Sequence, residues 1–184
     1  MASNFNLAKN RLKGLASPFR EDNSLYENYT SVLENQLTDG IIESVNTENL
    51  NQNLIYSMPH HPIIRNDKET TKLRIVLDVS SKEKNCFSLN DNLKVGPNLN
   101  PNLLILLLKF REFRIELVSD VKKAFLQIVL AEDCQRFLWS DNFPPNNFKI
   151  YRNKKVTFGV KSSPFLLASN HKTPHKRITK DHIL

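Results

Sequence analysis

The first part of the chain carries the apolar spacing of helices. Side chains three or four positions apart predict one apolar helix face at Leu25, Tyr29, Val32, Leu33 and Leu37. Asp22 or Asn23 is expected to cap the start of this helix, and Gly40 is expected to end it.

A shorter helix is predicted ahead of it. Its apolar residues are Leu7, Leu12 and Leu15, and Pro18 is expected to break it. The polar stretch 46–53 is interpreted as a linker. Residues 1–58 are therefore predicted to form a helical lead-in to a second unit at residues 59–184.

Strand patterns begin at residue 59. Residues 60–65 and 72–78 are short β-branched runs separated by a polar loop, which predicts a hairpin. In the second run apolar residues alternate with others, so one face is expected to be apolar while the opposite face carries Arg74 and Asp78.

The rest of the chain predicts both helices and strands. A helix of about ten residues is expected from Asn102, and another from Ser162, where a serine cap and Pro164 suit the first turn. Strands are predicted at residues 114–120, 125–130, 135–139, 148–152 and 155–158, the last two forming a hairpin. Antiparallel strands with segregated helices predict an α+β fold.

The charge favours a polyanionic partner. The formal net charge is +7, and residues 142–180 contain nine Lys and Arg and no acidic residue. A segment that faces phosphates would show such a bias, whereas a merely solvated surface more often mixes both signs. Nucleic acid is the expected class of partner.

Other features exclude several classes of site. The four glycines are too far apart for a glycine-rich phosphate loop, and the two cysteines, Cys86 and Cys134, suggest neither a zinc site nor a disulfide framework. The start of the chain lacks the apolar core of a signal peptide, and the aliphatic run 103–108 is too short to span a bilayer. We expect an intracellular protein, cytoplasmic or nuclear, that is not secreted and has no membrane partner.

Three stretches, in order, resemble motifs of reverse transcriptases. Residues 72–80, KLRIVLDVS, are similar to the fingers strand of retroelement polymerases. Residues 119–128, SDVKKAFLQI, look like the first catalytic motif, in which an aspartate at a strand end precedes an alanine and an aromatic. Residues 156–168, VTFGVKSSPFLLA, are similar to the second core motif with its Gly and Ser-Pro.

Three further stretches narrow the resemblance to the Pol polyprotein of BEL/Pao-type long-terminal-repeat retrotransposons. They are YSMPHHPIIR at 56–65, SLNDNLKVGPNL at 88–99 and EDCQRFLW at 132–139. The resemblance covers residues 25–168. It implies a right-hand polymerase fold, with the fingers and part of a palm, including an antiparallel sheet, in residues 59–184.

This resemblance implies template-directed DNA synthesis from dNTPs on an RNA template and a DNA primer. Two Mg²⁺ ions would serve the transfer, because hard cations take carboxylate oxygens. By resemblance, Asp120 is the catalytic carboxylate that bridges both ions, and the carbonyl of Val121 completes the metal site. Ala124 and Phe125 are expected beside the nucleotide, where the ring of Phe125 would select deoxynucleotides; an ordinary core phenylalanine is the alternative.

Further nucleotide and template contacts follow from the same resemblance. Arg74, with help from Lys72 or Lys68, would grip the triphosphate, since a guanidinium offers forked donors; a solvated hairpin face is the alternative. Phe158 stands where retroviral enzymes have a glutamine, and Gly159 would let the backbone approach nucleotide or template. The Ser163–Pro164 pair would start the helix under the templating base.

The carboxylate partner that Asp120 needs is missing from the sequence. In this family it comes from a Tyr-x-Asp-Asp hairpin, and no adjacent pair of aspartates occurs in these 184 residues. Asp78, Asp91 and Asp133 are interpreted as structural, and the spacings of His60 with His61 and of His171 with His175 do not predict a metal site. The chain is expected to be a polymerase truncated before that hairpin and inactive alone.

Two functional hypotheses remain open. The first is a reverse-transcriptase fragment, whose partners are RNA template, DNA primer, dNTP and the rest of the Pol polyprotein. The second is a non-catalytic module that binds RNA or an RNA/DNA hybrid through its basic face. A pseudogene product without function is a third, blander possibility.

Overall fold

The computed structural model describes residues 4–45, 56–65, 67, 72–130 and 135–172. The element order is α1 (Phe5–Gly14), α2 (Ala16–Glu21), α3 (Asn23–Thr38), β1 (Ile42–Val45), β2 (Ser57–Met58), β3 (His60–Ile64), β4 (Leu73–Leu77), α4 (Leu89–Asn92), α5 (Leu103–Phe110), the 3₁₀ helix η2 (Ala124–Gln127), β5 (Arg136–Trp139), β6 (Lys149–Asn153) and α6 (Ser163–Lys172). This is a mixed α+β architecture, as the sequence predicted at that level.

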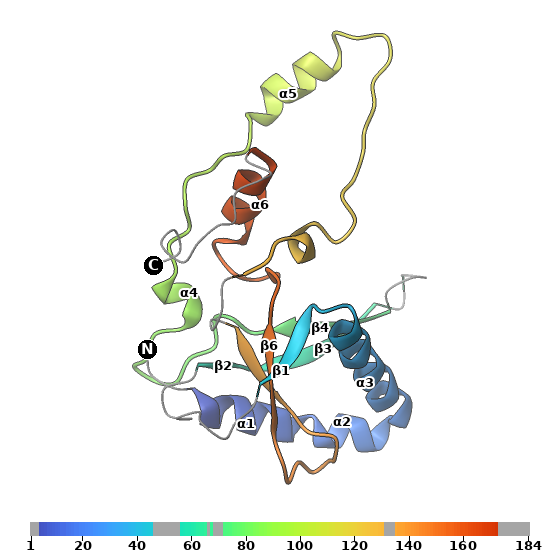
Figure 1. The fold of residues 1–184 in the computed structure, drawn as a ribbon, viewed down its shortest axis with the longest axis vertical. Helices are drawn as coiled ribbons and strands as arrows, with labels where there is room; N and C mark the ends of the chain where they lie inside the picture. The colour runs from blue at the N-terminus through green and yellow to red at the C-terminus, as the bar shows by residue number, and fades with distance from the viewer. Residues whose placement is uncertain (1–3, 46–55, 66, 68–71, 131–134, 173–184) are drawn as a thin grey trace.

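The strands form two sheets. The larger has the order β1-β6-β5-β2, in which β6 is antiparallel to both β1 and β5 while β2 is parallel to β5, so this sheet is mixed and not antiparallel throughout as predicted. The second is the predicted hairpin of β3 and β4, in a register that places Pro62 opposite Ile75. Figure 1 shows helices α1 and α2 below the large sheet and α3 beside it, while α5 lies on a long arm at the other end of the view.

The three N-terminal helices share one core with both sheets. Helix side chains such as Leu12, Phe19, Tyr29 and Leu33 are buried together with strand residues, of which Trp139 is the largest. The indole lies parallel to the ring of Tyr29 at 5.1 Å between centroids. Strand β1, which belongs to the lead-in, also pairs with β6, so the lead-in and the strands stabilise one another; the boundary at residue 58 stays a prediction.

The N-terminal helices largely follow the sequence pattern. Helix α3 begins where Asp22 accepts a hydrogen bond from the Leu25 backbone N–H at 3.1 Å, and Gly40 follows its end with φ of +64°. The break predicted at Pro18 is wrong, because α2 runs through Pro18. In the first turn of a helix the backbone N–H has no helical acceptor, so α2 tolerates Pro18. The helical run is interrupted at Leu15 instead, between α1 and α2.

Two predicted strands and one predicted hairpin are wrong. Residues 114–120 form no strand and are exposed, because no segment among the described residues pairs with them. Residues 125–130 contain η2 and a single bridge between Val129 and Lys155. The hairpin of 148–152 with 155–158 does not form, since β6 pairs with β1 and β5 and the chain then continues against residues 128–130.

Other predicted elements are confirmed. Helix α5 is capped by Asn102, whose side chain accepts from Leu104 N at 2.9 Å, and α6 contains Pro164 in its first turn. The predicted linker 46–53 and the chain beyond Lys172 lie outside the described residues. No helix in the described part of the chain is long and apolar enough to cross a bilayer.

Candidate functional site

The turn at Gly159 holds three segments together. Its φ is +88°, a left-handed conformation that suits glycine. The buried side chain of Asn90, in α4, donates to the Gly159 carbonyl and to Ser80 Oγ, each at 2.9 Å, and its Oδ1 accepts from the Lys161 backbone N–H at 2.9 Å. One asparagine therefore joins the segment after β4 to the turn that leads into α6.

Strand β4 approaches the same turn. A Cβ built on Gly159 would lie 3.8 Å from the Leu77 carbonyl oxygen and 3.7 Å from Val79 Cγ2, which is ordinary contact. Arg74 and Lys72 are exposed, while the alternate residues of β4 pack on the main core, as the alternation predicted. The guanidinium of Arg74 is thus on the solvent side of a strand that ends beside Gly159.

An aromatic pair brings the first and second motifs into contact. The rings of Phe125 and Phe158 meet edge to face, with 4.8 Å between centroids. Phe125 and its neighbour Ala124 are half-buried, and Phe125 packs on the small cluster of Ile128, Val156 and Leu166. The side chain of Phe158 is 68% exposed, so the pair has one face in solvent.

The predicted template residues differ in exposure. Ser163 is buried, and its hydroxyl donates to the Thr157 carbonyl at 2.8 Å, while Thr157 Oγ1 donates to Gln135 Oε1 at 2.9 Å. Pro164 is exposed. The Ser163 side chain fixes the turn before α6 and is not directed into solvent, whereas Pro164 is open to a ligand.

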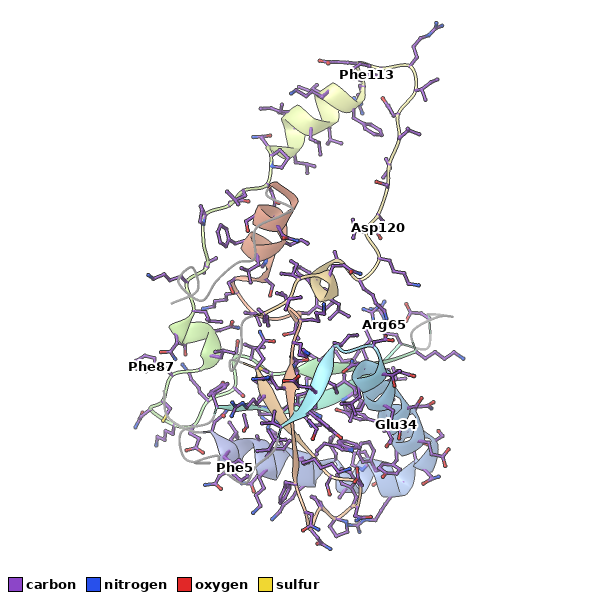
Figure 2. The ribbon with its side chains drawn as sticks, viewed as in Figure 1. Phe5, Glu34, Arg65, Phe87, Phe113 and Asp120 are labelled. Atoms are coloured by element: carbon purple, nitrogen blue, oxygen red, sulfur yellow. The ribbon has the colours of Figure 1, made fainter. Side chains whose placement is uncertain are left out.

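Asp120 does not join this group. It lies with Val121 on the exposed loop between α5 and η2, away from the sheets (Figure 2). The sequence placed Asp120 at a strand end, but the preceding residues have no strand partner among those described. No group of three or more His, Cys, Asp or Glu side chains in the described ranges could hold a metal ion. The residues present therefore do not fit a pair of Mg²⁺ ions.

Of the other acidic candidates, Asp91 and Asp78 are described by the structure, and both form hydrogen bonds within the fold. Asp91 forms a capping box with Ser88 at the start of α4 and an ion pair with Lys82 at 2.8 Å; the hydrogen bond from Lys82, followed by those from Ser88, lowers the pKa of this carboxyl. The Asp78 backbone N–H donates to the Pro59 carbonyl. Asp133 and Lys68 lie outside the described residues.

In the described part of the basic segment, three cations form ion pairs inside the molecule. Lys149 forms an ion pair with Asp141, and Arg152 with Glu43, which Lys154 approaches at 3.3 Å. The hydrogen bond from Arg152 is the main cause that lowers the pKa of Glu43. The described part of the segment therefore presents less free positive charge than its sequence predicted.

Sequence reasoning missed two important residues. Asn90 gave no signal of its own, although Ser88-x-x-Asp91 matches a capping box and could have predicted α4. The spacing of His60 with His61 does not predict a metal site and indicates no other role, yet His60 is buried and bonded to Tyr29 OH and to the Leu138 carbonyl.

A scan against models of protein families gives no match to this chain, and a search of curated proteins also finds no similar sequence.

Proposed function

We propose that this chain forms the fingers and part of the palm of a reverse transcriptase of the BEL/Pao retrotransposon group. The observation that carries the proposal is the convergence of its motifs. The fingers-like strand β4, the Phe125 segment and the Phe158–Gly159 turn are far apart in the sequence, yet all meet around Gly159.

Exposed groups at Gly159 and on the strand that leads to it suit a nucleotide. Arg74, three residues before Leu77 on β4, offers a charged fork for phosphate oxygens. The open face of Phe158 offers a surface on which a base or a sugar can pack. Gly159 has no side chain that would keep a ligand from the backbone. These features support a nucleotide-binding role for Arg74, Phe125, Phe158 and Gly159.

Catalysis by this chain alone is not expected. Asp120 is the one predicted catalytic carboxylate, and no second carboxylate lies with it in a metal-binding group among the described residues. A two-metal transfer needs convergent carboxylates. Primer extension by the purified chain with Mg²⁺ present would therefore contradict the assignment of an incomplete site.

Photo-crosslinking tests the nucleotide site. A dNTP with a photoreactive group is mixed with the chain and an RNA/DNA primer-template, and labelled peptides are identified by mass spectrometry. We expect label in residues 72–80 and 156–164, competition by unlabelled dNTP, and roughly tenfold less label in Arg74→Ala. In the control Arg65→Ala, which removes the cation paired with Asp67 on the same hairpin, labelling should persist. Label spread over many peptides, and not reduced by unlabelled dNTP, would contradict the proposal.

A second function is favoured by the surroundings of Phe158. Lys155 and Lys161 flank the exposed ring in sequence, and neither forms an ion pair with another described residue. An aromatic ring between cations can stack on a base of single-stranded RNA. If this is the function, Phe158→Ala and Lys161→Ala weaken RNA binding measured by fluorescence anisotropy. The photoreactive dNTP then gives no crosslink that unlabelled dNTP can compete away.

A further inference from the structure

Residues 103–122 form an arm whose apolar side chains are uncovered. Every apolar residue of α5 is at least 40% exposed, and in the following loop Ile115 and Leu117 are 83% and 92% exposed. Phe113 lies at the tip of this arm and Asp120 on its returning side (Figure 2). A helix that is apolar all round is normally buried, so the arm needs a cover.

The returning side of the arm has the alternation of a strand. Its odd positions are apolar apart from one serine: Phe113, Ile115, Leu117, Ser119 and Val121. Its even positions are charged apart from one valine: Glu112, Arg114, Glu116, Val118, Asp120 and Lys122. All of these side chains are exposed, and none lies in a strand of the described structure. The sequence has the alternation of a strand, but the structure has bends at residues 112–115 and no regular element at 116–121, so a strand would form here only on pairing with a partner.

The order of the charges is self-complementary about Leu117. In an antiparallel pair of two such segments centred on Leu117, Arg114 of each copy lies opposite Asp120 of the other, and Glu112 lies opposite Lys122. On the other face, Phe113 lies opposite Val121 and the two Leu117 side chains meet at the axis. A register centred on Val118 would instead place Glu116 opposite Asp120.

We propose that two copies of this chain associate through residues 112–122, paired antiparallel across a two-fold axis at Leu117. The apolar face of the two-stranded ribbon is then covered by α5 of both copies. The same patch serves both partners, which is the isologous arrangement of a closed dimer. The proposal rests on the arm alone and does not depend on nucleotide binding at Gly159.

The Leu117 register and its alternative at Ile115 differ in the charged residues that they place opposite one another. A register centred on Ile115 would place Arg114 opposite Glu116 and leave Asp120 without an opposite charge. The Leu117 register forms twice as many opposite-charge pairs across the ribbon. Exchange of the charges at 114 and 120 therefore distinguishes the two registers.

Sedimentation velocity over a range of protein concentrations, without nucleic acid, tests the dimer. The unaltered chain should sediment as a dimer, and Leu117→Asp should give monomer, because two carboxylates would face each other on the axis. Phe87→Asp, at an equally exposed phenylalanine (68%) outside the arm, should remain dimeric. Circular dichroism should show the same fold in all three, since the arm makes no core contact.

The charge exchange gives the sharper result. Arg114→Asp should raise the dimer dissociation constant about tenfold, and the double variant Arg114→Asp/Asp120→Arg should restore it. A monomeric unaltered chain, open-ended aggregates, a dimer that survives Leu117→Asp, or a double variant no tighter than the single one would each overturn the proposal.

Discussion

His60 is a buried histidine that links three elements of the core. From β3 it bonds Tyr29 OH on α3 through Nδ1 and the Leu138 carbonyl on β5 through Nε2, the latter at 2.7 Å. A carbonyl only accepts, so Nε2 carries the proton and Nδ1 accepts from Tyr29. Burial lowers the pKa of His60 from 6.5 to about 4, and a neutral ring is what this pair of hydrogen bonds requires.

The depressed pKa predicts a loss of stability in acid. Between about pH 6.5 and pH 4 the unfolded chain binds a proton at His60 that the folded chain does not, so the free energy of unfolding falls as the pH falls. The loss amounts to about 3 kcal/mol at most. Urea denaturation at several pH values measures it, and His60→Gln should flatten the curve in this window. An equally steep curve in His60→Gln would assign the acid sensitivity to other groups.

Gly159 and Gly14 form a matched pair for substitution. Gly159→Ala should destabilise the fold by about 1–2 kcal/mol, because a side chain there must adopt a positive φ although space is available. Gly14→Ala, in helical backbone with open space around it, should stabilise by about 0.5–1 kcal/mol. Thermal melting of both variants checks the signs, and a neutral Gly159→Ala would mean that the turn does not require its left-handed conformation.

Among the elements, Asn90 connects α4 to the segment after β4 and to the turn at Gly159. Asn90→Ala leaves the Gly159 carbonyl and the Lys161 N–H without this partner, and should cost about 1–3 kcal/mol. Asn98→Ala removes only an exposed bond to the Asn100 N–H and should change stability by less than about 0.5 kcal/mol. Denaturant midpoints compare the two, and equal effects would show that Asn90 does not join these segments.

The elements that the sequence predicted well are those whose signals are local. The cap at Asp22, the apolar face of α3, the alternation in β4 and the proline at the start of α6 each depend on neighbouring residues only. The strand at 114–120 failed for a different reason. Its apolar and polar residues alternate clearly, but a strand forms only when it pairs with another strand. The alternation does not predict whether such a partner strand is present.

The candidate site shows the same limit. The motifs identified Phe125, Phe158 and Gly159, which the structure brings together, but they could not show that the Ser163 hydroxyl is used inside the turn. They also could not show that Glu43, more than a hundred residues away, pairs with Arg152 and Lys154. Such contacts depend on which strands become neighbours, and β1 joins β6 only in the folded sheet.

At the scale of the whole molecule, the N-terminal helices and the sheets depend on one core. Removal of residues 1–40 would uncover Trp139, whose neighbours include Phe19, Tyr26 and Tyr29. The shortened chain should lose cooperative unfolding, and the emission of this single tryptophan should shift to the red. An unshifted emission with a cooperative melt would mean that residues 41–184 fold without the three N-terminal helices.

Arg74, Phe125, Phe158 and Gly159 are proposed to form the nucleotide site of a template-directed polymerase. The most direct measurement is the affinity of the chain for a labelled RNA/DNA primer-template, by fluorescence anisotropy, with each of the four dNTPs in turn. We expect the dNTP complementary to the next template base to tighten binding, and Arg74→Ala to remove this effect while the binary complex survives. Equal effects of all four dNTPs, or none, would contradict it.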